Sequence, residues 1–247
     1  MSYSFVLLIL SALIPSIIIM AYVFGKDRVE KEPIGRLIAL FIFGCLASIP
    51  VVLLSDSVEN LFKSIVEVKN VGTFYLYVLI TIAMLEEGFK FLVLVILTWK
   101  AKSFNCLFDG IVYAVFVSIG FATLENVLYV VLSKSGGFDV AMIRAISAVP
   151  GHAINAVFMG ALYGMAKYYS FWGRTGASAR NIILALIVPM LTHAFYDTTA
   201  MLKSEKAEWI WLAFVVVSTI VAICVIRRFS KKDDYIDLRS QKREAYE

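Results

Sequence analysis

Three ionisable side chains stand in the middle of an otherwise apolar segment, TIAMLEEGFKFLVLVIL, which covers residues 81–97. They are Glu86, Glu87 and Lys90. An ionisable side chain at the centre of a bilayer costs about 2.5–3.5 kcal/mol on insertion scales, so such groups persist where they face the protein interior and have partners. Two adjacent carboxylates in a low-dielectric site do not both ionise cheaply. We therefore expect one to keep its proton while the other serves as a base toward water.

Three further apolar segments carry other costly polar groups. These are Glu125 with Asn126, His152 with Asn155, and His193 with Asp197. Residues three or four apart share one face of a helix, which places Glu86 beside Lys90 and His193 beside Asp197. Both histidines of the chain lie in these segments, so its general acid–base chemistry is expected there.

This set of side chains is compatible with hydrolysis of an amide bond inside the membrane. A glutamate can act as general base toward water, and a histidine or an amide can donate hydrogen bonds to the developing oxyanion. The chain has no HExxH motif, and no motif pairs a serine nucleophile with a histidine. We expect no cofactor on this reading.

Two other chemistries stay open from the residues alone. Two histidines with carboxylates also suit zinc, and its ligands would be Glu86, Glu125, His152 and His193. Membrane carboxylates can also relay protons in a transporter. The transporter reading is weaker, because the chain shows no two halves with matching broken helices.

The composition indicates what kind of fold must position these groups. Of 247 residues, 60% are hydrophobic and 17% are charged, against roughly 25% charged in soluble domains. With a strongly positive mean hydropathy, the chain is expected to be an all-α polytopic membrane protein. No basic domain with interleaved aromatic residues suggests nucleic acid as a partner. The three cysteines form no metal or disulfide pattern.

Seven apolar segments approach or exceed the roughly 20 residues that a helix needs to cross a bilayer. They are residues 3–24, 37–55, 71–98, 107–132, 151–171, 181–201 and 208–226. Together they form one membrane domain, 1–229, followed by a charged tail, 230–247, which has little to bury. Lysine and arginine are concentrated in residues 25–36, 99–106 and 167–180 and in the tail. This distribution predicts an outer N-terminus and a cytoplasmic C-terminus.

The predicted orientation places the costly residues at similar depth. Counting 20 residues back from Leu97 places the outer boundary of the third segment near Val78. Glu86 lies eight residues further in, which is about 12 Å below that surface. Glu125, His152 and His193 fall in the same outer layer by the same count. We therefore expect these side chains to surround one polar cavity in the outer half of the membrane.

Four short motifs carry a resemblance to a known family. EEGFK, FATLENVLY, GHAINAVFMGALYG and HAFYD resemble, in this order, the motifs of the PrsW family, over about residues 71–200. That family is similar to the CAAX prenyl endopeptidases and bacteriocin-processing enzymes, which are glutamate-type intramembrane proteases with the motifs EExxxR, FxxxH and HxxxN or HxxxD. The chain departs from this wider pattern at Lys90. Lys90 comes four residues after Glu86, whereas the arginine of EExxxR comes five residues after the first glutamate. It also has Asp197 where the prenyl endopeptidases have asparagine.

The resemblance implies a protease of the bacterial cell membrane. The reaction would be the site-1 cut in a membrane-anchored anti-sigma factor, which releases an extracytoplasmic-function sigma factor under envelope or antimicrobial-peptide stress. The partners would be a single-pass membrane protein as substrate and the lipid bilayer.

Residue roles combine this resemblance with the chemistry above. We expect Glu86 to activate the attacking water, and Glu87 to share or shuttle the proton and to fix the water, and which of the two is the base stays open. His152 and His193 position the water or stabilise the oxyanion. Asp197 orients His193. The supporting residues are Lys90, which tunes Glu86, and Glu125, Asn126 and Asn155 in the polar cavity.

Overall fold

The computed structural model describes residues 3–132 and 138–236, and the regular structure in this part of the chain is helical. The elements are α1 (Tyr3–Lys26), α2 (Ile34–Ile65), α3 (Val71–Val78), the π-helical turn η1 (Leu79–Ala83), α4 (Met84–Thr98), α5 (Asp109–Leu132), α6 (Phe138–Phe171), α7 (Thr175–Met201) and α8 (Glu205–Lys231). Within the described ranges, the β-type pairing is limited to an isolated bridge between Cys106 and Tyr235. The predicted all-α fold is confirmed.

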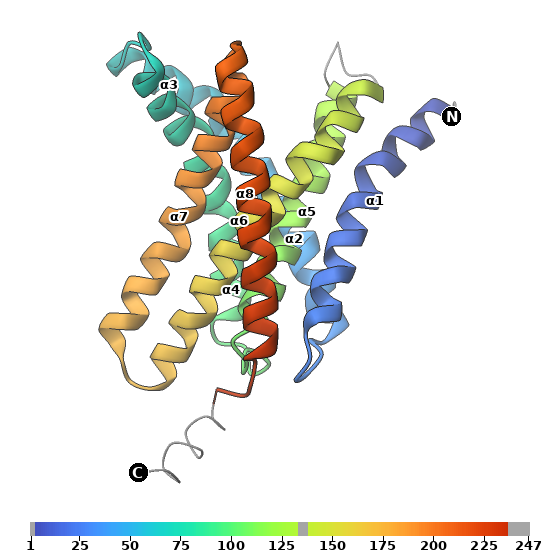
Figure 1. The fold of residues 1–247 in the computed structure, drawn as a ribbon, viewed down its shortest axis with the longest axis vertical. Helices are drawn as coiled ribbons and strands as arrows, with labels where there is room; N and C mark the ends of the chain where they lie inside the picture. The colour runs from blue at the N-terminus through green and yellow to red at the C-terminus, as the bar shows by residue number, and fades with distance from the viewer. Residues whose placement is uncertain (1–2, 133–137, 237–247) are drawn as a thin grey trace.

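The helices form rods in the order of the predicted apolar segments. α3, η1 and α4 follow one another without a break, so they make one rod. α1 begins at one end of the bundle and α8 ends at the other (Figure 1). Among the described residues, four helical stretches qualify as membrane spans by length and composition alone: Ile34–Ile65, Asp109–Leu128, Thr175–Met201 and Glu205–Lys231. The chain is a polytopic membrane protein, while seven crossings and their orientation stay predictions.

Two helices are longer than their apolar segments. α2 was predicted to end at residue 55 but continues to Ile65. On this extension Phe62 is buried against Tyr77 of α3, with ring centroids 5.7 Å apart. α6 was predicted to begin at residue 151 but begins at Phe138 and continues through Pro150. A proline inside a membrane helix is tolerated where neighbouring groups satisfy the freed carbonyl.

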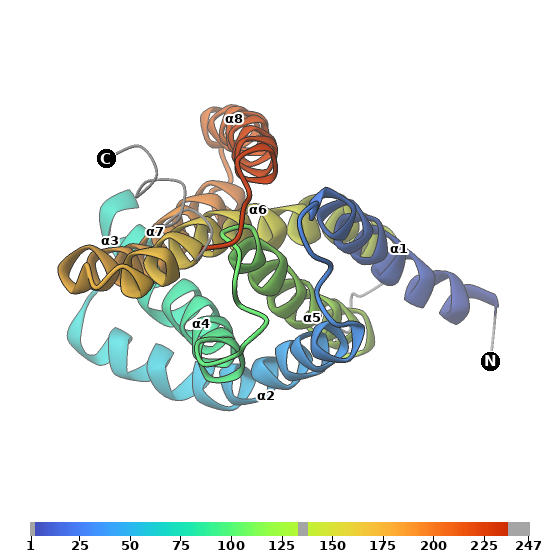
Figure 2. The same cartoon turned by 90° about the horizontal axis from the view of Figure 1, so that it is seen from below.

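Helix α5 lies in the middle of the bundle, with α1, α2, α4 and α6 around it in Figure 2. Its contacts with two neighbours are made by backbone. A Cβ atom added at Gly120 of α5 would lie 2.1 Å from the carbonyl oxygen of Phe41 in α2, and one added at Gly160 of α6 would lie 2.4 Å from that of Gly110 in α5. Small residues permit this approach between membrane helices, and the resulting packing fixes the rotation of each helix.

The chain after α8 folds back onto the loop between α4 and α5. The Asp233 carboxylate accepts a hydrogen bond of 3.0 Å from the backbone N–H of Phe108. The backbone N–H of Ile236 donates to the carbonyl of Asn105 at 2.8 Å, and the Ile236 side chain is buried. The described part of the predicted tail is therefore docked on the helical domain, and the rest lies outside the described residues.

Candidate active site

Four rods bring the predicted polar side chains to one place. α4 supplies Glu86, Glu87 and Lys90, α5 supplies Glu125 and Asn126, α6 supplies His152 and Asn155, and α7 supplies His193 and Asp197. The turn η1 lies almost directly before the two glutamates, and π-helical turns of this kind are frequent at functional sites. The side chains of both glutamates are buried.

Lys90 lies at the centre of the cluster and is fully buried. Its Nζ atom is 2.8 Å from Oε1 of Glu87 and 3.3 Å from Oε2 of Glu86. It is also 2.9 Å from Nδ1 of His152 on α6. The predicted neighbour of Lys90 was Glu86, one turn away, but the shorter contact is to Glu87. The ammonium therefore joins both glutamates to a histidine of another helix.

These contacts fix the tautomer of His152. An ammonium group only donates, so Nδ1 of His152 accepts and the ring proton lies on Nε2. Nε2 donates to Oε2 of Glu125 at 3.0 Å, and Arg144 Nη2 lies 3.0 Å from the same oxygen. Arg144 also donates through Nε to Oδ1 of Asn126 at 2.8 Å. Both ring nitrogens of His152 are thus engaged by side chains.

His193 lies among three carboxylates. Its Nδ1 atom is 2.9 Å from Oε1 of Glu87, and its Nε2 atom is 3.3 Å from Oδ2 of Asp197 and 3.9 Å from Oε2 of Glu86. Ionised carboxylates only accept hydrogen bonds, so a ring protonated at both nitrogens satisfies Glu87 and Asp197 together. The predicted contact between Asp197 and His193 is present.

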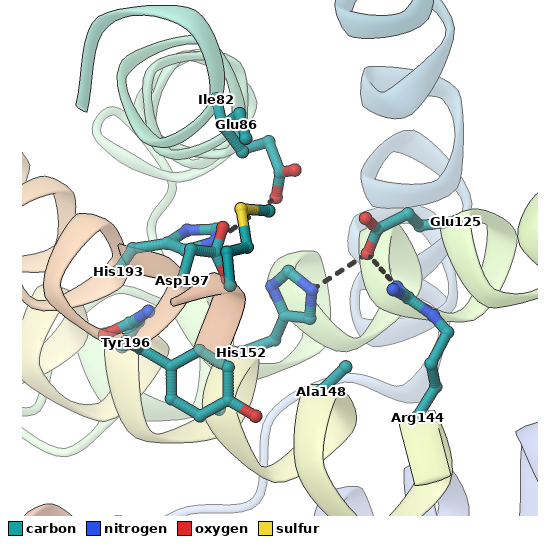
Figure 3. Close-up of a pocket in the computed structure, with 12 residues that line it drawn as sticks. Ile82, Glu86, Glu125, Arg144, Ala148, His152, His193, Tyr196 and Asp197 are labelled. Atoms are coloured by element: carbon teal, nitrogen blue, oxygen red, sulfur yellow. Dashed lines mark hydrogen bonds and ion pairs between the residues drawn. The ribbon is translucent and has the colours of Figure 1, made fainter. Parts of the chain in front are cut away.

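A cavity of about 100 Å³ opens between these groups. Figure 3 shows the Glu86 carboxylate pointing into the space between His193, His152 and Glu125. Asn155 also lines this cavity, and its Oδ1 atom accepts a hydrogen bond of 2.7 Å from Thr192. A polar space of this size accommodates several water molecules.

A second cavity, of about 250 Å³, lies between α2, η1 and α5. Its walls include Val51, Val52 and Phe121, and it shares Ile82, Glu86 and Glu125 with the first cavity. Glu87 is in the lining of neither of these two cavities. Of the two adjacent glutamates, Glu86 is therefore the one that can meet water and substrate.

All nine site residues predicted from the sequence lie in or directly beside this cluster. Sequence reasoning missed Arg144, because the predicted apolar segment began only at residue 151. A helix that runs through Pro150 places Arg144 two turns before His152, and that spacing was the available signal. Tyr196 of α7, which lines the first cavity, was also missed.

Comparison with known proteins decides the family. Residues 32–226 match the family model described as PrsW family intramembrane metalloprotease. The chain belongs to the PrsW family. It is 31% identical to Protease PrsW of Clostridioides difficile strain 630 over 96% of this chain and 98% of that protein. It is 32% identical to Protease PrsW of Oceanobacillus iheyensis over 89% of this chain and 95% of the relative.

A third relative, Protease PrsW of Bacillus subtilis strain 168, is 31% identical over 83% of this chain and 86% of its own length. No solved structure matches the chain. With the family shown, this PrsW protein is an intramembrane peptidase and a multi-pass protein of the bacterial cell membrane.

The family description implies a metal ion, which side chains of this cluster would have to bind. Within the described part of the chain, the group close enough to share an ion is Glu86, Glu87 and His152, whose ligand atoms lie within 4.8 Å of one another. This group differs from the predicted zinc ligands, because Glu87 takes the place of Glu125 and His193. Glu125 is held instead by Arg144 and by Nε2 of His152.

The Lys90 ammonium already lies among these atoms, 2.8–3.3 Å from each of the three side chains. Zinc binds nitrogen and oxygen ligands at about 2.0–2.2 Å, so an ion and this ammonium do not share the space. As arranged, the residues of this PrsW protein do not fit a metal ion.

Proposed function

We propose that this PrsW peptidase makes the site-1 cut in a single-pass, membrane-anchored anti-sigma factor. The cut releases an extracytoplasmic-function sigma factor under envelope or antimicrobial-peptide stress. The substrate class is supported by the resemblance of four motifs to the PrsW family. The observation that carries the peptide chemistry is the position of Glu86, whose carboxylate faces a polar cavity beside His193.

In the proposed reaction, Glu86 takes a proton from water as the oxygen attacks the scissile carbonyl carbon. The resulting tetrahedral oxyanion accepts the hydrogen bond of His193 Nε2 in place of Asp197, whose contact of 3.3 Å is the longer of the ring's two short carboxylate contacts, while Glu87 keeps the other ring nitrogen at 2.9 Å. Glu86 then returns the proton to the leaving amide nitrogen as the C–N bond breaks. Proton and charge balance across these two steps without another reactant.

The neighbouring residues then have positioning roles. Glu87 is held between Lys90 and His193 and fixes the second histidine rather than the water. His152 carries a single ring proton, on Nε2, which is donated to Glu125 at 3.0 Å, and its Nδ1 atom accepts from Lys90, so it has no proton left for the oxyanion and supports the site instead. Asp197 keeps His193 oriented.

The second cavity supports a substrate that reaches Glu86 from the membrane. It meets the first cavity at Glu86, and its lining combines the apolar side chains of Val51, Val52, Phe121 and Leu128 with the polar side chains of Ser48, Ser55 and Glu59. At about 250 Å³ it is too small for an intact helix, which is about 10–12 Å across. We therefore propose that the substrate chain is extended where it is cut.

The test is cleavage of a tagged anti-sigma factor by reconstituted protein. Removing a general base typically costs about 10²–10⁴ in rate, so we expect Glu86→Gln to fall by that factor. Glu87→Gln and His193→Ala should also lose activity. Glu67→Gln, on a side chain that is 75% exposed, is the matched control and should cut normally.

Two results would overturn the proposal. Full cleavage by Glu86→Gln and His193→Ala at normal insertion levels would remove the chemistry. If Glu86→Gln cells still release the sigma factor, the protein acts as a stress-sensing partner of the anti-sigma factor and not as its protease. Solute flux in vesicles without cleavage would favour a transporter.

A further inference from the structure

We propose that the Lys90 ammonium is the resident cation of this active site and holds the place that a metal ion takes in a metalloprotease. The inference concerns the same site as the proposed function. Its test reads bound metal rather than cleavage, so the two can fail separately.

The surroundings of Lys90 match a cation-binding shell. An ammonium has three N–H donors, and three acceptors surround it: Oε1 of Glu87 at 2.8 Å, Nδ1 of His152 at 2.9 Å and Oε2 of Glu86 at 3.3 Å. The ring of Phe121 lies on another side, with its centroid 4.3 Å from Nζ. Aromatic faces attract cations, most strongly when both are desolvated. The side chain is fully buried, so these groups replace its hydration.

The hydrogen bond from His152 to Glu125 strengthens the comparison with a metal site. A histidine that ligates a metal commonly donates its other ring N–H to a carboxylate, which fixes its tautomer and orientation. Here Nδ1 of His152 faces the ammonium and Nε2 donates to Glu125 at 3.0 Å. Two carboxylates and a correctly oriented imidazole therefore surround a cation that is part of the polypeptide.

This arrangement predicts a gain of metal binding when the ammonium is removed. In Lys90→Ala, the oxygens of Glu86 and Glu87 and the Nδ1 lone pair of His152 would face an emptied space. These are ligand types that zinc accepts. Wild-type protein, whose ammonium fills that space, should bind no zinc there.

The experiment compares wild type, Lys90→Ala and Lys90→Ala/Glu87→Gln, purified in detergent, exposed to zinc and dialysed. We expect one zinc per chain in Lys90→Ala only, bound at least about 100-fold more tightly than by wild type. Loss of one ligand in the double variant should weaken binding by at least the roughly 100-fold that a supporting residue contributes. Cobalt in place of zinc should give visible absorption in the single variant.

Two results would overturn the inference. One is wild-type protein that carries one zinc per chain and loses it in Glu86→Gln. The other is folded Lys90→Ala that binds no more zinc than wild type. Should Lys90→Ala fail to fold, wild type alone decides. The melting temperature of the wild-type protein should be unchanged by a chelator. A chelator that lowers this melting temperature, with recovery when zinc is added back, would refute the proposal.

Discussion

Replacing Arg144 by methionine should destabilise the protein by about 2 kcal/mol. Arg144 pairs with Glu125 at 3.0 Å and donates to Asn126 at 2.8 Å. Breaking a fully buried ion pair costs about 3–5 kcal/mol, because the remaining charge has lost its partner. The side chains of Arg144 and Glu125 are 19% and 17% exposed, and Glu125 keeps its bond from His152. Partial solvation and that bond therefore reduce the expected loss.

Thermal unfolding in detergent measures this effect. A change of 1 kcal/mol shifts the melting temperature by about 2–4 °C in chains of this size, so Arg144→Met should melt about 4–8 °C lower. Arg174→Met is the matched control, since Arg174 is exposed. An exposed substitution of this kind stays within about 0.5 kcal/mol of wild type.

The double variant Arg144→Met/Glu125→Gln makes the test specific. The glutamine removes the unpaired charge but keeps an oxygen that accepts the Nε2 proton of His152. The double variant should therefore be more stable than Arg144→Met alone, with a coupling energy of about 1 kcal/mol or more. The ion pair, and with it this arrangement of α5 and α6, would be refuted if the stability change of the double variant equals the sum of the changes in Arg144→Met and Glu125→Gln to within about 0.5 kcal/mol.

Two further predictions concern packing and pH. Gly120→Ala should lower the melting temperature strongly, because its Cβ would lie 2.1 Å from the Phe41 carbonyl oxygen, while Gly25→Ala, with nothing within 4 Å, should not; equal melting of both variants would contradict the close packing of α2 on α5. Burial raises the pKa of Glu32, outside the helices, so the fold favours its protonated form, and the resulting stability is lost as pH rises through the folded pKa. Glu32→Gln mimics that form and should melt increasingly above wild type as the pH rises above 4.5, the ordinary pKa of a glutamate; an advantage that shrinks as the pH rises would refute the assignment.

The helical period explains which site contacts the sequence could predict. His193 and Asp197 are one turn apart on α7 and do meet, as do Glu86 and Lys90 on α4. Each of these contacts joins two residues of the same helix, where the backbone alone fixes which side chains are neighbours. The closest partner of Lys90 on its own helix is nevertheless Glu87, three residues before it, because the side chain turns toward His152.

The amino-acid sequence by itself determined that this chain is helical, that it lies in a membrane, and which four segments bring costly polar groups into it. Those conclusions follow from composition, segment length and the energetic penalty for charge in lipid. Only the tertiary structure decided that Lys90 joins Glu86 and Glu87 to His152, that Arg144 belongs to the site, and that Glu86 rather than Glu87 faces the cavity. Contacts between helices depend on how each helix is rotated against its neighbours. That rotation is set by backbone packing, such as Gly120 on Phe41, which no single segment encodes.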